Sequence, residues 1–372
     1  MRRNILKLTV IVTGSAGLLL SGCHGEPQPR KIHYDLKPPF NVTAIRADLK
    51  KHYTKTFRCE RPPKPMKDLF FESMYEKSSK NASVVDPVAY KKYKQDIKPL
   101  TTLETGLSTT ANKYVESNPP RSEIAECVTS WMSVWADAHG MMGKDNHTGE
   151  FLRKWILASV SMAYVQVRDD PYISPDTHKN IETWIRHLSE RVMDDFSKHP
   201  DIKSRNNNHM YWAAWGVMAA GIALDDRKMF DWGLYEAKVG IFQIEKDGTL
   251  PLEVARGQKA FNYHQFAAIP LFMMAETAYA NGINLYDMND QGLKRLARLI
   301  LNNVDDQSYF VKLTGKKQDM HRAITSSNLV WLEIYRRHYD DLDADRLLAK
   351  FRPVKHSRVG GDATLLYGKL FQ

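Results

Sequence analysis

The sequence lacks the features that mark several specialised classes of protein. Its 372 residues include only 3 cysteines and 17 prolines, and apolar and charged residues make up 43% and 26% of the chain. These proportions exclude a disulfide-dense small scaffold, a collagen-like chain and a disordered chain. A mean hydropathy of -0.47 also excludes a polytopic membrane protein. A chain of this length can bury a large core without help from a metal or a disulfide.

Motifs for several common chemistries are also missing. The sequence has no His-Glu-x-x-His pair, paired-cysteine motif or acidic calcium loop, so nothing in it requires a metal ion or another cofactor. It has neither a Gly-x-Ser-x-Gly elbow for acyl transfer nor a nucleic-acid-binding motif. Strand patterns are weak, because no run of alternating β-branched residues is bounded by turn dipeptides. The chain is therefore predicted to be all-α.

Residues 1–22 form a segment distinct from the rest. Three basic residues precede an apolar run over 8–20, which is the pattern of a secretory signal peptide. Small residues then precede Cys23, which predicts cleavage by a lipoprotein signal peptidase and a lipid attached to the cysteine. A plain signal peptide with an incidental cysteine is the alternative. A membrane-spanning helix is disfavoured, because the run is shorter than the roughly 20 residues that spanning requires.

This segment predicts an exported protein with a lipid anchor. His24 rather than Asp follows the cysteine, so in a Gram-negative cell we expect the periplasmic face of the outer membrane. Residues 1–22 hold three basic and no acidic residues, so the net charge of +10 becomes +7 without them. A basic exported protein favours anionic polysaccharide or lipid headgroups over nucleic acid. We expect a monomer that contacts a membrane only through its anchor.

The two remaining cysteines, Cys59 and Cys127, can form one disulfide in an oxidising compartment. It would tie a proline-rich segment, residues 23–66, to the first helices. We interpret that segment as a tether and an irregular wrapped stretch without core residues. Residues 67–372 are predicted to form one domain. Within it the polar, poorly periodic stretch 67–86 fits either a lid over a site or a solvated surface loop.

Helical periodicity dominates from about residue 88. Apolar residues in 178–197 recur at three- and four-residue steps, which predicts an amphipathic outer helix. In contrast, 210–224 carries no charge and is apolar on every side, so this helix must be buried. The same alternation recurs and predicts paired inner and outer helices in an α/α barrel or solenoid: 155–165 with 178–197, 210–224 with 227–245, and 263–280 with 291–304.

Three polar clusters interrupt these apolar stretches, and a site should be sought there. The first, residues 206–209, lies directly before the buried helix. Asn206 and Asn207 are best explained as N-cap residues. For Asn208 and His209 a structural role and a functional role are equally open.

The other two clusters lie ahead of or within the first turns of further apolar helices. They comprise Arg256, Tyr263 and His264 in one, and Asn146, His147, Arg153 and Trp155 in the other. On spacing alone, His147 is more often a cap or a structural histidine than a ligand. A glycosidase needs two juxtaposed carboxyl groups. The clusters offer Asn, His, Arg and Tyr instead, which suits a different reaction on a sugar acid.

Taken in order, these motifs resemble the alginate lyases of polysaccharide lyase family 5. The resemblance covers roughly residues 57–340 and implies an incomplete (α/α) toroid, an exported location and depolymerisation of mannuronate-rich alginate by β-elimination without a metal. It is carried by an ordered series: Asn146-His147-Thr148-Gly149 with Arg153-Lys154-Trp155, Asn207 to Trp215, Phe230-Asp231-Trp232, Asp247-Gly248 with Leu250-Pro251 to Arg256, and Tyr263-His264.

The resemblance also assigns catalytic roles. β-Elimination removes the C5 proton of a uronate, which requires a neutralised carboxylate and a stabilised enediolate. Asn208 and Arg256 match the positions with this task, and His209 and Tyr263 match the remaining two. On mannuronate, Tyr263 can act as base and then as acid if Arg256 or a charged histidine lowers its pKa. For a substrate with opposite-face geometry, His209 would be the better base.

Substrate contacts are expected from a wider set: Tyr75 in the lid, Asn146, His147, Arg153, Trp155, Trp212 and His264. Met74 stands where many members of the family carry a substrate-contacting lysine, so the preferred uronate stays open. The leading prediction is a lyase of polymannuronate. One alternative is a lyase of polyglucuronate or hyaluronate, and another is a noncatalytic lipoprotein that binds anionic polysaccharide.

Overall fold

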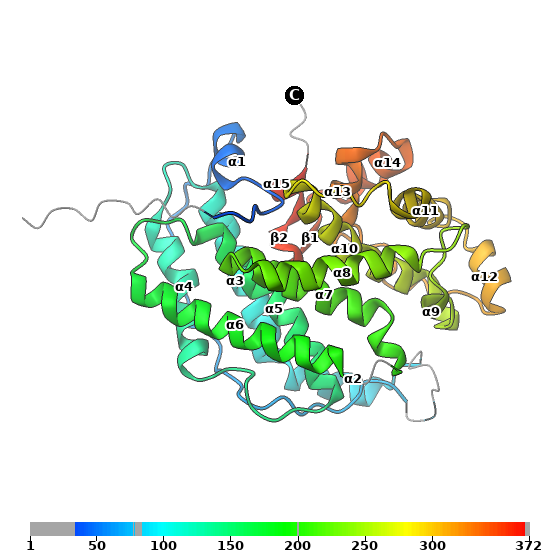
Figure 1. Cartoon of the computed structure of the whole chain (residues 1–372), viewed down its shortest axis with the longest axis horizontal. Helices are drawn as coiled ribbons and strands as arrows, with labels where there is room; N and C mark the ends of the chain where they lie inside the picture. Colours follow the sequence, from blue (N-terminus) through cyan, green and yellow to red (C-terminus); the bar gives the residue numbers. More distant parts are fainter. Residues whose placement is uncertain (1–33, 77, 79–83, 199–200, 369–372) are drawn as a thin grey trace, which may run out of the picture.

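The computed structural model describes residues 34–76, 78, 84–198 and 201–368. Five inner helices lie side by side, and the helix that follows each of them in the chain packs against it from outside (Figure 1). The inner helices are α3 (Lys98–Glu116), α5 (His147–Val167), α7 (Asn208–Leu224), α10 (Ala260–Ala280) and α13 (Trp331–His338). Their outer partners are α4 (Ser122–Asp137), α6 (Pro175–Ser197), α8 (Arg227–Phe242), α11 (Met288–Asn302) and α14 (Leu342–Phe351). This is the paired-helix, all-α arrangement predicted from the sequence.

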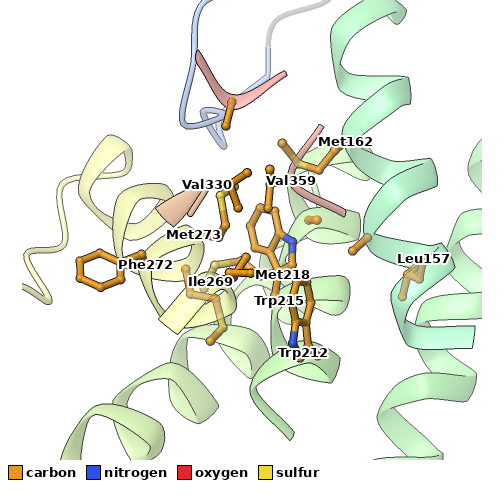
Figure 2. Packing of buried hydrophobic residues seen from close by; sticks show 14 of the residues in the cluster. Leu157, Met162, Trp212, Trp215, Met218, Ile269, Phe272, Met273, Val330 and Val359 are labelled. Atoms are coloured by element: carbon orange, nitrogen blue, oxygen red, sulfur yellow. The ribbon is translucent and has the colours of Figure 1, made fainter. Parts of the chain in front are cut away.

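Helix α7 lies at the centre of the core. It has no charged residue and is buried along nearly its whole length, as its uniformly apolar sequence predicted. Figure 2 shows Trp215 and Met218 of α7 packed beside Ile269 and Met273 of α10. Helix α8 approaches α7 closely at Gly233, where a Cβ would lie 2.7 Å from the Cβ of Met218. The five inner helices, which together are called the inner ring below, are therefore held by apolar packing on every side of α7.

The outer helix α6 illustrates why the sequence folds as it does. Ser174 caps its start by accepting a hydrogen bond from the backbone N–H of Thr177, and Pro175 occupies the first turn. Its buried residues include Ile181, Ile185 and Leu188, which share one face. The predicted amphipathic helix over 178–197 is confirmed.

Short elements complete the described chain. They are α1 (Val42–Asp48), α2 (Pro87–Asp96), η1 (Lys203–Arg205), α9 (Pro251–Val254), η2 (Gly257–Lys259), α12 (Ser308–Thr314), β1 (Lys355–His356), η3 (Ser357–Val359), β2 (Gly361–Asp362) and α15 (Ala363–Tyr367). The two strands pair antiparallel and were not predicted. Together with η3 they lie against α3 and α5. Asn112 of α3 holds this segment, because its side chain donates to Gly360 O (2.9 Å) and accepts from Asp362 N (2.8 Å).

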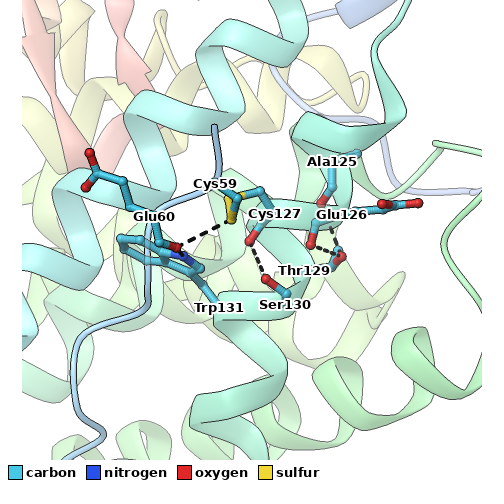
Figure 3. Close-up of a disulfide and its surroundings, with 8 residues drawn as sticks. All are labelled: Cys59, Glu60, Ala125, Glu126, Cys127, Thr129, Ser130 and Trp131. Carbon is cyan, nitrogen blue, oxygen red and sulfur yellow. Dashed lines mark hydrogen bonds between the residues drawn. A yellow bond between two sulfur atoms is a disulfide. The ribbon is translucent and has the colours of Figure 1, made fainter. Parts of the chain in front are cut away.

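The N-terminal segment wraps around the helices and is fixed to them. The predicted disulfide between Cys59 and Cys127 is confirmed, with the two Cα atoms 5.6 Å apart (Figure 3). Beside it, the Trp131 indole N–H donates to the carbonyl oxygen of Glu60 (2.8 Å). The expectation that this segment lacks core residues is wrong, since Leu36 and Phe40 are buried. The predicted signal peptide and Cys23 lie outside the described residues.

Removal of the disulfide should destabilise the fold. The Cys59→Ala/Cys127→Ala double variant frees a closed stretch with a sequence separation of 68 residues. We expect its free energy of unfolding to fall by about 2–4 kcal/mol, measured by urea denaturation. A reducing agent should lower the stability of the parent protein by a similar amount and leave the double variant unchanged. Equal urea midpoints for the two proteins would contradict a stabilising role.

Candidate active site

The predicted site residues gather where the first turns of the inner helices α5, α7 and α10 meet. His209, the second residue of α7, lies against Lys154 of α5, and Trp155 lies edge-on to Phe266 of α10. Tyr263, one turn before Phe266, also contacts that ring edge-on. Helix N-termini carry partial positive charge and favour anions. This end of the inner ring therefore suits a negatively charged ligand.

Asn208 is held by a buried carboxylate that the sequence did not reveal. Glu253 of α9 accepts from the backbone N–H of Asn208 (2.8 Å) and from Nδ2 (2.9 Å to each carboxylate oxygen). Both residues are fully buried, and burial raises the pKa of Glu253. The Oδ1 atom of Asn208 is buried without a hydrogen-bond partner in the described part of the chain. A buried amide oxygen without a hydrogen-bond partner in a native site indicates that a ligand or a water binds there.

His209 is packed and hydrogen-bonded on one side. Its ring stacks on Phe151 with the centroids 3.8 Å apart, and its Nδ1 lies 3.0 Å from Nζ of Lys154. The N-cap residue Asn207 accepts from its backbone N–H (3.0 Å), which confirms the predicted cap at that position. Burial, followed by the positive charges of Lys154 and Arg256, lowers the pKa of His209 well below the usual value. The histidine is therefore neutral near pH 7, whereas a charged histidine was one of the two expected activators of Tyr263.

Tyr263 lies under Arg256 and beside the lid. The guanidinium carbon of Arg256 is 3.6 Å from the centre of the Tyr263 ring, and the hydroxyls of Tyr263 and Tyr75 are 3.0 Å apart. Burial raises the pKa of Tyr263 above that of an ordinary phenol, and the charge of Arg256 only partly opposes this. The predicted effect of Arg256 on the pKa of Tyr263 has the right sign, but the predicted net lowering of that pKa is wrong. Tyr263 therefore rests as a neutral phenol.

The described part of the stretch 67–86 lies over this site. Tyr75 pairs with Val85 in an isolated antiparallel bridge, and Nζ of Lys259 lies 5.3 Å from the centre of its ring. The lid interpretation is thus favoured over a solvated loop for Tyr75, while residues 77 and 79–83 lie outside the described residues.

Asn146 anchors the base of the lid. Its side chain caps α5 by accepting from Gly149 N (3.1 Å) and also donates to the carbonyl oxygen of Phe71 (2.9 Å). Gly149 is required here, because a Cβ would lie 2.0 Å from the carbonyl oxygen of Leu69. His147 is exposed and lies 3.2 Å from a carboxylate oxygen of Glu150. The structural role of Asn146 thus accounts for its place in the motif.

Trp155 is the aromatic side chain of α5 best placed to meet a ligand. The guanidinium carbon of Arg358 lies 4.2 Å from the centre of its ring, and the ring of His209 is 6.1 Å away. Its indole N–H has no acceptor among the described residues. Arg358 comes from η3 and was not predicted, because the short C-terminal elements give no periodic pattern. It forms an ion pair with Glu104 of α3 (3.0 Å).

Besides Asn146, three more of the expected substrate contacts have structural roles instead. Arg153 is fully buried and forms ion pairs with Asp145 and Asp195. Trp212 is fully buried, and its indole N–H donates to Phe266 O (3.2 Å).

His264 is the third. It is buried, its Nε2 accepts from Leu250 N (2.9 Å) and its Nδ1 donates to Ala260 O (2.7 Å). Burial lowers its pKa to about 4, so the ring is neutral and fastens the loop before α9 to α10. With both ring nitrogens occupied by backbone groups, neither is left for a substrate.

Among the described residues, no group of three or more His, Cys, Asp or Glu side chains is arranged to hold a metal ion. None of the helices in the same part of the chain is both long enough and apolar enough to cross a membrane.

Comparison with known proteins gives consistent results. The family model described as alginate lyase matches residues 71–310. An alginate lyase of Pseudomonas syringae pv. syringae is 39% identical over 319 residues, which cover 84% of this chain and 83% of the relative. An alginate lyase of Cobetia marina is 36% identical over 342 residues, 89% of each chain.

Solved structures show the same fold. Alginate lyase A1-III from Sphingomonas species A1 matches with a TM-score of 0.78 and 24% identity, over 89% of this chain and 95% of that one. A histidine-to-alanine variant of alginate lyase A1-III, complexed with a tetrasaccharide, matches with a TM-score of 0.79 and 24% identity. The match covers 91% of this chain and 98% of that one. The predicted incomplete (α/α) toroid is confirmed.

A structural role for Arg153 predicts a large loss of stability on its removal. Arg153→Met leaves the carboxylates of Asp145 and Asp195 with the more exposed Arg191 as their remaining partner, and we expect the free energy of unfolding to fall by about 3 kcal/mol. Arg227→Met, which removes an exposed ion pair with Asp231, is the control and should change it by less than about 1 kcal/mol. Urea unfolding measures both. Equal losses for the two variants would show that Arg153 does not support the fold in this way.

Proposed function

This chain belongs to the alginate lyase family, and we propose that it cleaves the 1,4-glycosidic bonds of mannuronate-rich alginate by β-elimination. The products carry a 4-deoxy unsaturated uronate at one new end. The catalytic residues are Asn208, His209, Arg256 and Tyr263. The observation that carries this proposal is the placement of Tyr263 between Arg256 and the lid residue Tyr75, at the same end of the inner ring as Asn208 and His209.

Removal of the C5 proton is the difficult step. It becomes feasible when the uronate carboxylate is neutralised and the developing enediolate is stabilised by fixed donors. Arg256 supplies a guanidinium, which keeps its charge in proteins and offers several N–H donors. The amide of Asn208 is held in place by Glu253, so its orientation is set before substrate arrives.

Tyr263 then moves the proton. Its phenolate oxygen takes the C5 proton, the C–H electron pair forms the C4–C5 double bond, and the C4–O4 bond breaks. The departing oxygen leaves with C1 of the neighbouring sugar and takes the proton from the Tyr263 hydroxyl. One group can serve both steps on mannuronate, where proton and leaving oxygen lie on one face. Since Tyr263 rests as a phenol, it must first release its proton to water, and the adjacent Arg256 stabilises the phenolate that results.

The protein is further proposed to act at the periplasmic face of the outer membrane, as a monomer anchored through a lipid on Cys23. The basic, apolar and small-residue order of 1–22 supports this location. The disulfide between Cys59 and Cys127 also fits an oxidising compartment.

Lipidation makes a direct prediction. Cells given a radiolabelled fatty acid should incorporate label into the parent protein and not into Cys23→Ala, which loses the only acceptor sulfur at the predicted cleavage site. Equal labelling of the two proteins would refute the anchor without affecting the proposed reaction.

The reaction is tested by ultraviolet absorbance of the unsaturated uronate during incubation with polymannuronate, polyguluronate, polyglucuronate and hyaluronate. We expect the fastest increase with polymannuronate. Tyr263→Phe should bind the polymer with unchanged affinity but lose turnover by at least about 10³-fold, because it removes the group that carries the proton. Tyr235→Phe, at an exposed position of α8, is the matched control and should retain full activity.

Three results would count against the proposal. Comparable turnover by Tyr263→Phe would refute the catalytic assignment. Faster cleavage of polyglucuronate or hyaluronate would replace the proposed substrate. Binding without any increase in absorbance would favour the noncatalytic polysaccharide-binding alternative.

A further inference from the structure

Lys154 is a buried lysine without a carboxylate partner in the described part of the chain. It lies in the second turn of α5 and is fully buried, and no ion pair joins it to an acidic side chain in the described residues. Its ammonium instead faces three aromatic rings, with Nζ 4.5 Å from the centres of Phe151 and Phe196 and 5.4 Å from that of Trp155. Burying such a charge is unfavourable unless the site gains something in return.

Both hydrogen bonds of Lys154 are made with one residue. Nζ lies 3.0 Å from Nδ1 of His209 and 2.8 Å from the carbonyl oxygen of the same residue. Phe151, one turn before Lys154, stacks on the His209 ring. Helix α5 therefore holds the histidine by its ring face, by one ring nitrogen and by its backbone.

The contact with Nδ1 defines where the histidine keeps its proton. An ammonium group can only donate, so Nδ1 must accept, and a neutral imidazole then carries its hydrogen on Nε2. A neutral amine could accept from Nδ1–H instead. Burial, followed by the charges of Arg205 and Arg358, lowers the pKa of Lys154. The three aromatic faces around Nζ act in the opposite direction and favour the ammonium form, because ring faces attract cations.

We propose that Lys154 is the positioning residue of His209, which it holds as a neutral imidazole with its hydrogen on Nε2, so that the histidine acts on the substrate as a hydrogen-bond donor and not as a base. This inference rests on the proposed function for its chemical meaning. Nε2–H can then donate to the uronate carboxylate or to the developing enediolate, and proton abstraction is left to Tyr263.

The charges around His209 also favour its neutral form. His209 faces Lys154 and His147 of α5, Arg205 of η1 and Arg256 after α9, all of which lower its pKa. The acidic group that acts on Lys154, Glu150, is already engaged by Arg205 (2.8 Å) and His147 (3.2 Å).

Arg358 completes this group of positive charges, facing Lys154 from η3. Loss of the Lys154 charge should therefore let the pKa of His209 rise toward the ordinary value near 6.5.

The first test needs no change at Lys154. In the purified parent protein labelled with ¹⁵N-histidine, multiple-bond ¹H–¹⁵N spectra should show His209 as the Nε2–H tautomer from about pH 8 to pH 5, with His209→Gln used only to assign the signal. An Nδ1–H tautomer, or a titration near pH 6.5 in the parent protein, would overturn the proposal.

The second test is Lys154→Met, which keeps an unbranched side chain and removes the donor. We expect the pKa of His209 to rise, although burial and Arg256 still hold it below the ordinary value. We also expect a new acidic limb of kcat/KM at the pH where the histidine titrates, and a kcat that falls about 10-fold or more with KM within about twofold. The melting temperature should stay the same or rise, because a buried charge without a counterion is removed. Lys179→Met, which removes the same charge from an exposed position of α6, should change none of these.

Each further outcome has a defined meaning. A lower melting temperature with an unchanged pH profile would show a merely structural lysine and overturn the proposal, as would unchanged kcat. If the parent protein cleaves no polyuronate, the proposed function fails, and the histidine spectra still decide whether Lys154 sets the tautomer.

Discussion

The burial of α7 is the constraint on which the rest of the site depends. Because this helix carries no charge and is enclosed by α5, α6, α8 and α10, its position is determined by packing on every side. Its first two residues, Asn208 and His209, are thereby presented at one end of the inner ring. Two buried ionisable side chains from other elements, Glu253 and Lys154, then fix the orientation of these residues. Apolar packing thus decides where the polar groups lie, and polar contacts decide how they are turned.

The same burial determines the protonation of the resting site. It raises the pKa of Tyr263 and of Glu253 and lowers that of His209, so each of these groups is shifted toward its neutral form. Guanidinium groups do not respond in this way, because they keep their proton in proteins. Arg256 therefore keeps its charge over the ring of Tyr263, and Arg358 keeps its charge beside Trp155 in an ion pair with Glu104. A uronate bound beside Arg256 would bring its reacting carbon to the phenol.

The sequence predicted the helices better than it predicted the neighbours of each side chain. The uncharged run of α7 and the periodic face of α6 required only composition and spacing. In contrast, Arg153, Lys154 and Trp155 are consecutive, yet one is a structural ion-pair partner, one holds His209 and one lines the site. Successive residues of a helix point about 100° apart, so a motif alone does not say which of them reaches the ligand.

Other features had no signal in the sequence. The link between Glu253 and Asn208 joins residues 45 positions apart, and Arg358 enters the site from a segment whose strands are two residues long. Neither a long-range pair nor a two-residue strand produces a periodic pattern. The disulfide was predictable because only two cysteines remain once Cys23 is assigned to the anchor.

The C-terminal segment also has a consequence for the order in which the protein becomes functional. Arg358 stacks on Trp155 and its carbonyl oxygen accepts from the Trp215 indole (2.7 Å), while Asn112 of α3 holds the neighbouring strand. The site is thus assembled from residues that a ribosome makes almost three hundred positions apart, from the lid residue Tyr75 to Arg358. Contacts between such distant parts form late in folding. A growing chain therefore carries an unfinished site until Arg358 has been added, so a complete site cannot form before synthesis has passed that residue.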